Sequence, residues 1–274
     1  MNQNLEFYFA GAALIVVLIG FWLFCLRRFI GFIATHRELL QNIIFGITGF
    51  CLSSSLVLRG IHLERFPCSN LYESLLVVAL GLALIHLFLS NYSKIKFLDW
   101  PTALLIIATL AYAIWLPSSQ KEAIPLIPAL DSYWRIIHVP ALLISYGFLT
   151  LAGIIAIFYL FEEKKTNNQD KLDSLQENMY KCVAFGFPLL TFGIVTGALW
   201  ANKTWGNLWQ WDPKENLALA TWFCYAAYLH LKISKKVSNR ALAWINGAGI
   251  LVIYLTYLGI NQFDLGGLHT YGKV

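Results

Sequence analysis

Long apolar runs alternate with short polar gaps along the whole chain. A run of about 20 apolar residues is the length that a helix needs to cross the hydrocarbon core of a bilayer. Such runs are too long for membrane strands, and backbone groups in the core must be hydrogen-bonded within the segment, so each run predicts a transmembrane helix. Eight runs occur, at residues 7–26, 42–58, 70–90, 98–117, 136–161, 182–200, 217–233 and 241–260.

The composition agrees with this pattern. Hydrophobic residues make up 58% of the chain, charged residues make up 13%, and the mean hydropathy is +0.61, which excludes an ordinary soluble domain. We therefore expect an all-α integral membrane protein, a polytopic bundle of about eight transmembrane helices. The whole chain, residues 1–274, is expected to form one membrane domain, with the polar stretch 162–181 as a connector after the fifth span.

The basic residues predict the orientation. If the gaps between spans are numbered from the N-terminal tail as zero, the odd-numbered gaps hold thirteen of the twenty Lys and Arg residues and the even-numbered gaps hold seven. Basic residues concentrate on the cytoplasmic side, so the connector 162–181 is expected there, with both termini outside. The net charge of +5 follows mainly from these anchors and favours anionic lipid headgroups as neighbours, not nucleic acid.

A tryptophan-rich segment lies in an external gap, at residues 200–216. Trp205, Trp209 and Trp211 occur within eleven residues that end at Glu215. Tryptophan anchors proteins at the membrane interface, and an interfacial aromatic belt is one interpretation of the segment. Three so close exceed what anchoring needs, and they favour a platform for a flat hydrophobic ligand. Asp212-Pro-Lys-Glu215 predicts a helix start with a capping box, which leaves the three tryptophans in a non-helical segment.

Histidines supply candidate ligands. His138 begins the fifth span and His269 lies in the C-terminal tail, both on the predicted outer side. Two neutral imidazoles approaching one iron from opposite faces are what an axially ligated haem requires. His230 lies inside the seventh span, where an ionisable group is costly and indicates a functional site. His86 lies at a comparable depth in the third span, and we expect it to snorkel to the headgroups.

Other polar residues carry weaker signals. Arg135, Lys203 and Lys214 lie on the predicted outer side and could pair with carboxylates such as haem propionates. The five cysteines are scattered without a C-x-x-C pair, and only Cys68 falls in an external loop, where a thiol could be exposed. The motifs G-x-S-x-G, H-E-x-x-H and C-x-x-C-H are absent from the sequence, which argues against hydrolysis and against a c-type cytochrome.

Together these residues resemble a known family, the CcsA/ResC-type cytochrome c biogenesis proteins of System II. The resemblance covers roughly residues 66–272 and centres on the tryptophan-rich "WWD" domain of haem-handling proteins. The matching segments are Trp205–Glu215 followed by Trp222, Trp134–His138, Tyr228–His230, Gly267–Gly272 and Pro67–Ser74.

The resemblance implies a membrane protein that carries haem outward and presents it to apocytochrome c for covalent attachment. It implies a transiently bound b-type haem, a ResB/CcsB-type membrane partner, and a place in a holocytochrome c synthase (haem lyase) complex. The membrane would be a bacterial inner membrane or a thylakoid, with the WWD segment outside. The resemblance assigns iron ligation to His138, His269 and, within the membrane, His230, and haem binding also to Trp205, Trp209, Trp211 and Asp212.

Three other functions fit parts of the pattern. A b-type cytochrome electron-transfer subunit requires paired histidines at two depths on well-formed helices. A secondary transporter would show inverted repeats and broken helices near the midplane, and the sequence shows neither. A structural anchor would bind no chromophore.

Overall fold

The fold is helical throughout the described part of the chain. The computed structural model describes residues 4–27, 29–93, 97–122, 126, 128, 130–166 and 168–260, and regular structure within them is entirely helical. The chain divides into two compact units, Met1–Ile127 and Pro128–Val274. Each unit has its own buried core, and a single membrane domain over residues 1–274 stays a prediction.

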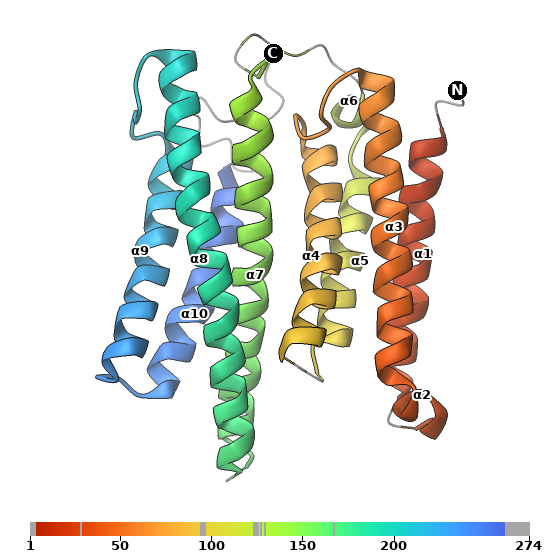
Figure 1. Ribbon diagram of the computed structural model, residues 1–274, viewed down its shortest axis with the longest axis vertical. Coiled ribbons are helices and arrows are strands. Elements are labelled where there is room, and N and C mark those ends of the chain that lie inside the picture. Colours follow the sequence, from red (N-terminus) through yellow and green to blue (C-terminus); the bar gives the residue numbers. More distant parts are fainter. Residues whose placement is uncertain are drawn as a thin grey trace. The chain divides into compact units, whose positions relative to one another are not determined.

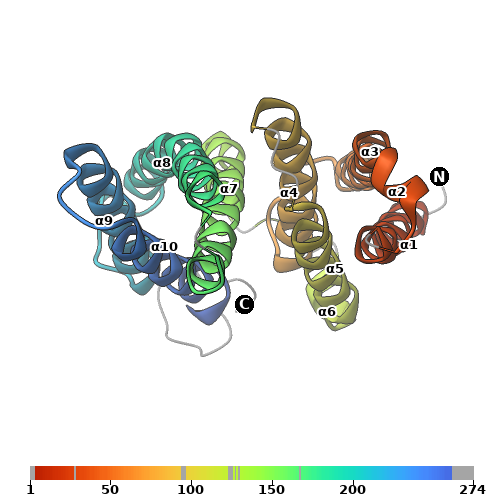
Figure 2. The same ribbon diagram turned by 90° about the horizontal axis from the view of Figure 1, so that it is seen from below.

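The first unit is a four-helix arrangement with two short extra helices. Its long helices pack in a ring in which each contacts two others, α1 against α3 and α5, and α4 against the same two (Figure 2). The short helices α2 and α6 follow α1 and α5. The bounds are α1 Leu5–Leu26, α2 Gly31–Thr35, α3 Arg37–Leu63, α4 Leu71–Ser93, α5 Asp99–Trp115 and α6 Ser118–Lys121.

The second unit repeats this ring, and two of its helices, α7 and α8, are longer than any in the first unit. Here α7 packs against α8 and α10, and α9 packs against the same two. The beginning of α7, the end of α8 and the beginning of α9 lie at one end of this unit (Figure 1). The bounds are α7 Tyr133–Glu163, α8 Gln169–Trp205, α9 Pro213–Ser234 and α10 Asn239–Tyr254, and α10 runs into the π-helical turn η1, Leu255–Gly259.

Each of the eight predicted spans overlaps one of these eight long helices. Among the described residues, six helical segments are long and apolar enough to cross a bilayer. The other two long helices are α5, which is apolar but only 17 residues long, and α9, which carries polar residues toward both ends. These six segments agree with a multi-pass membrane protein. They are Leu5–Leu26, Arg37–Leu63, Leu71–Tyr92, Tyr133–Glu163, Gln169–Trp205 and Asn239–Gly259.

In helix α8, hydropathy indicates the part that crosses the bilayer but does not indicate where the helix begins and ends. With 37 residues it is about 55 Å long, whereas the hydrocarbon core is about 30 Å thick. The expected connector 162–181 is mostly helical, and its place on the cytoplasmic side stays a prediction. Only a short turn separates α7 from α8, and residues 169–181 form the first turns of α8, whose N-cap Asn168 accepts a hydrogen bond from the Lys171 amide.

Candidate functional site

His138 is held against α8 by two glycines. Its Nδ1 lies 2.7 Å from the carbonyl oxygen of Gly193. A Cβ built on Gly197, one turn further along α8, would lie 2.6 Å from the same Nδ1 and closer still to Cε1. Small residues four apart let helices approach closely, so Gly193 and Gly197 form a notch that receives the imidazole of α7.

The hydrogen bond in this notch determines the tautomer of His138. A carbonyl oxygen only accepts, so Nδ1 carries the proton and donates it to Gly193. The lone pair of the neutral ring then resides on Nε2. Metal-ligating histidines are typically oriented in this way, with one ring nitrogen donating to a carbonyl or carboxylate and the other facing the metal.

Tryptophans continue from His138 toward the end of α8. The ring of Trp200 is 5.7 Å from that of His138, and the ring of Trp205 is 6.2 Å from that of Trp200. Trp205 was expected in the non-helical segment, and that expectation is wrong because it is the last residue of α8. The helix ends only at Gly206, whose φ of +80° suits the left-handed C-cap position.

The segment between α8 and α9 is held by acidic side chains. Glu215 accepts hydrogen bonds from the backbone amides of Gln210, at 2.8 Å, and Asp212, at 3.2 Å. Asp212 in turn accepts from the Lys214 amide at 2.8 Å, so the predicted capping box is confirmed. Asp212 therefore fixes the start of α9, and its part in haem binding stays a prediction.

Trp209 and Trp211 lie in this segment but not in one plane. Their ring centroids are 6.2 Å apart and the planes are 83° apart, so both cannot lie flat on one planar ligand. Trp211 is 70% exposed and has a φ of +57°, which is unfavourable for a bulky residue. Asn216 holds this conformation by donating its side-chain amide to the Trp211 carbonyl at 2.9 Å. Strain of this kind concentrates at functional sites.

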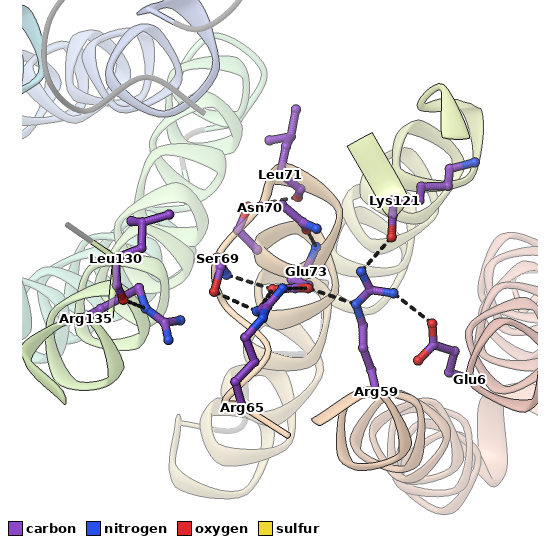
Figure 3. Close-up of polar contacts among 11 residues, drawn as sticks. Glu6, Arg59, Arg65, Ser69, Asn70, Leu71, Glu73, Lys121, Leu130 and Arg135 are labelled. Carbon is purple, nitrogen blue, oxygen red and sulfur yellow. Dashed lines mark hydrogen bonds and ion pairs between the residues drawn. The ribbon is translucent and has the colours of Figure 1, made fainter. Parts of the chain in front are cut away.

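The three cations of the sequence analysis have distinct surroundings. Arg135 is buried, and its Nε donates to the Leu130 carbonyl at 2.7 Å (Figure 3). The Lys203 ammonium lies 5.0 Å from the centre of the Tyr133 ring. Burial lowers the pKa of Lys214 to about 8, although the nearby Asp212 carboxylate opposes the shift. Pairing of these cations with carboxylates of a ligand stays a prediction.

Of the other two predicted iron ligands, the structure describes His230. His230 lies on α9 with its side chain exposed on the surface of the second unit, whereas the neighbouring Tyr228 points into the core. His269 lies outside the described residues. The roles of both histidines stay predictions.

His86 corrects an expectation from the sequence. It does not snorkel, since it is 1% exposed and its ring stacks on Phe45 at 4.0 Å. Its Nδ1 is 3.2 Å from the Thr102 hydroxyl, and its Nε2 is 3.5 Å from Asp99. Both of these residues lie at the polar start of α5. Their contacts stabilise the imidazole in the interior more than contacts with the lipid headgroups would.

In the first unit, the segment Pro67–Ser74 is organised around a buried carboxylate. Glu73 accepts hydrogen bonds from Arg59 at 3.0 Å, from both terminal nitrogens of Arg65 at 3.0 Å, and from the Ser69 amide at 2.7 Å (Figure 3). Cys68, beside Ser69, is only 1% exposed, so its thiol is buried although the residue lies between two predicted spans.

Arg59 extends this network to other helices. Its terminal nitrogens donate to Glu6 of α1 at 2.7 Å and to the Lys121 carbonyl of α6 at 2.6 Å. Its guanidinium also lies 5.1 Å from the centre of the Tyr72 ring. One buried arginine therefore joins α1, α3, α4 and α6 at the end of the unit where α4 begins.

Sequence reasoning missed Gly193, Gly197 and Trp200, which shape the surroundings of His138. The Gly-x-x-x-Gly spacing inside an apolar run was a usable signal, because it marks close helix packing in membranes. Nothing in the sequence indicates which helix packs there.

Known proteins resemble this chain over most of its length. A family model described as "Cytochrome C assembly protein" matches residues 68–268. The cytochrome c biogenesis protein CcsA of Pyropia yezoensis is 36% identical, over 98% of this chain and 97% of that protein. CcsA of Synechococcus elongatus is 33% identical, over 82% of this chain and 85% of that protein.

A solved structure resembles the fold as well. The cytochrome c heme lyase CcmF superposes with a TM-score of 0.63 at 18% identity, covering 96% of this chain and 49% of that chain. This chain thus corresponds to about half the length of CcmF, and the likeness shows a common fold. With the family match and the full-length relatives, the chain belongs to the cytochrome c assembly protein family, among its CcsA-type members.

Proposed function

We propose that this protein takes part in cytochrome c maturation by binding haem at the outer face of the membrane and presenting it to apocytochrome c. The observation that carries the proposal is the arrangement of His138, whose Nδ1 donates to Gly193 and whose Nε2 therefore has the lone pair that an iron ligand needs. Membership of the cytochrome c assembly family supports haem as the substrate.

In this proposal His138 and His269 are the two axial ligands of a transiently bound b-type haem. Trp205, Trp209 and Trp211 contact its ring, and the capping box at Asp212 keeps the last two in place. Because Trp209 and Trp211 are perpendicular, one of them packs on the face of the ring and the other borders its edge. Arg135, Lys203 and Lys214 supply positive charge for the propionates.

The reaction is covalent attachment of haem to the protein that receives it. Each cysteine thiol of apocytochrome c adds across a vinyl group of haem, the sulfur bonding to the inner carbon and the hydrogen to the outer carbon. This addition needs reduced iron and free thiols, which come from outside the chain. The contribution of this protein is to hold the vinyl edge next to the thiols, since positioning lowers the barrier of such a step.

His230 has a separate role in this proposal. An exposed imidazole in the apolar part of a membrane protein is costly unless it has a partner. We assign it to haem on its way across the membrane, with the opposite ligand supplied by a ResB/CcsB-type protein. The two proteins then form a holocytochrome c synthase in a bacterial inner membrane or a thylakoid, with the WWD segment and both termini on the outer side.

The alternative of a b-type electron-transfer subunit has less support. That function needs two pairs of histidines at two depths, and His86 is the residue that would pair with His230. His86 is instead engaged by Thr102 and stacked on Phe45.

The test is haem binding and cytochrome c maturation by the full chain co-expressed with its partner. We expect His138→Ala and His269→Ala to lose the Soret band of the purified protein and to reduce maturation, with partial recovery on adding imidazole. His62→Ala, an exposed histidine on α3, is the control and should leave both unchanged. Normal maturation in both ligand variants would overturn the proposal.

A further inference from the structure

Buried polar atoms without a hydrogen-bond partner gather at one place in the second unit. In the described part of the chain seven buried side-chain atoms lack a partner, and four of them belong to Tyr225, Tyr228 and Asn246. These are the two phenolic oxygens and both polar atoms of the amide. All three side chains are 0% exposed. The interface of α9 with α10 therefore contains a polar cluster inside an apolar bundle.

The three side chains meet because the two helices are antiparallel neighbours. Tyr225 and Tyr228 are one turn apart on α9, and Asn246 and Gly249 are one turn apart on α10. A Cβ on Gly249 would lie 2.6 Å from the Tyr225 oxygen, so the phenol rests on the α10 backbone there. Tyr228 faces Asn246, near enough to interact but outside hydrogen-bonding geometry. Since three residues rise about 4.5 Å, the cluster extends over about one helical turn.

The described part of the protein does not supply hydrogen bonds to these atoms. The nearby thiol of Cys224 donates to the Ile245 carbonyl at 3.4 Å, and Gly153 of α7 packs against Ile250 and the α10 backbone. A buried hydroxyl or amide that lacks a partner is costly, and native proteins satisfy nearly all such groups. A bound molecule that bridges the hydroxyls of α9 and the amide of α10 would satisfy these atoms.

The chemistry of the cluster identifies that molecule. None of the three side chains is a charged group, and an uncompensated ion is costly to bury, which favours a neutral ligand. Two hydroxyls and one amide offer both donors and acceptors, spaced by about one helical turn, which suits water with its two donors and two acceptors. We propose that Tyr225, Tyr228 and Asn246 bind one or a few internal water molecules that join α9 to α10.

The proposed waters help to fix the position of α9. The first residues of α9 form the capping box that holds the tryptophan segment, and the waters hold the same helix about three turns further on. Hydrogen bonds between helices add to the specificity that close packing gives in membranes. The inference does not depend on haem binding.

Radiolytic hydroxyl-radical footprinting of the full chain in nanodiscs tests the site directly, because bound water generates radicals beside the residues that contact it. We expect Tyr225 and Tyr228 to be oxidised at rates close to those of exposed tyrosines, with incorporation of ¹⁸O from labelled water. Tyr72, which is 2% exposed in the first unit, is the matched control and should remain protected. Protection of Tyr225 and Tyr228 equal to that of Tyr72 would overturn the proposal.

The sign of a stability change gives an independent test. If water binds the hydroxyl, Tyr228→Phe removes a satisfied group and should lower the unfolding midpoint by about 2–4 °C. If the hydroxyl lacks any partner, the same substitution removes a penalty and the midpoint rises, which would contradict the proposal. Tyr159→Phe is the reference, since its hydroxyl donates to Glu163 at 3.3 Å and its loss should lower the midpoint. An unchanged midpoint in Tyr228→Phe also counts against bound water, and the footprinting result stands even where a variant fails to fold.

Discussion

Replacing Gly197 by alanine tests whether the notch in α8 determines the position of His138. The added Cβ would lie 2.6 Å from Nδ1 of the imidazole. Ordinary contacts between such atoms begin at about 3.5 Å, so the ring must move by about 1 Å or rotate. Either movement disrupts the 2.7 Å hydrogen bond from Nδ1 to Gly193 and changes the direction of Nε2.

The expected result is a loss of haem affinity without a loss of fold. Changes to groups that orient a metal ligand typically cost about 10- to 100-fold in affinity, and we expect Gly197→Ala to fall in this range. Alanine in a helix interior is itself more favourable than glycine by about 0.5–1 kcal/mol, so the helix should not be weakened by the substitution. Haem titration of the purified protein, followed by Soret absorbance, measures the affinity, and thermal unfolding in detergent measures the fold.

The control is the same substitution at Gly247 of α10, where an added Cβ meets nothing within 4 Å. Gly247→Ala should bind haem as the unchanged protein does. If Gly197→Ala also retains full affinity, then either the imidazole is not the ligand or its orientation does not matter, and the reasoning from the notch fails.

Three further predictions concern charged groups. Glu73→Gln should lower the free energy of unfolding by about 3–5 kcal/mol, because Arg59, which is 2% exposed, then lacks a full counter-charge. A drop in the thermal midpoint too small to measure would contradict this prediction. Burial lowers the pKa of Lys214 to about 8 from its ordinary 10.5, so folding favours the neutral amine. The stability of the unchanged protein should therefore rise relative to Lys214→Met as the pH increases from about 8 to about 10.5, and a constant difference across that window would refute the assignment. Glu215→Ala removes the acceptor of two backbone amides, so hydrogen exchange in residues 207–212 should accelerate, and unchanged exchange would show that other contacts hold the segment.

Local chemistry determined much of the fold from the sequence alone. The eight apolar runs located the eight long helices, because a chain in a bilayer must bury its polar backbone within each crossing segment. Asp212-Pro-Lys-Glu215 identified the start of α9, since a capping box uses only atoms within a few residues. The boundaries of α8 were not predictable in this way. Apolarity indicates where the chain lies in lipid, whereas the helix continues through its polar first turns and ends only at Gly206.

Tertiary structure decided the surroundings of each functional side chain. His138 gained its notch from two glycines more than 50 residues away, and His86 gained Thr102 and Asp99 from a neighbouring helix. His230 and Tyr228 are two residues apart in sequence, yet one is exposed and the other lies in the core. The physical reason is that an apolar run shows no strong preference for one face, so the rotation of each helix is determined only by the partners against which it packs.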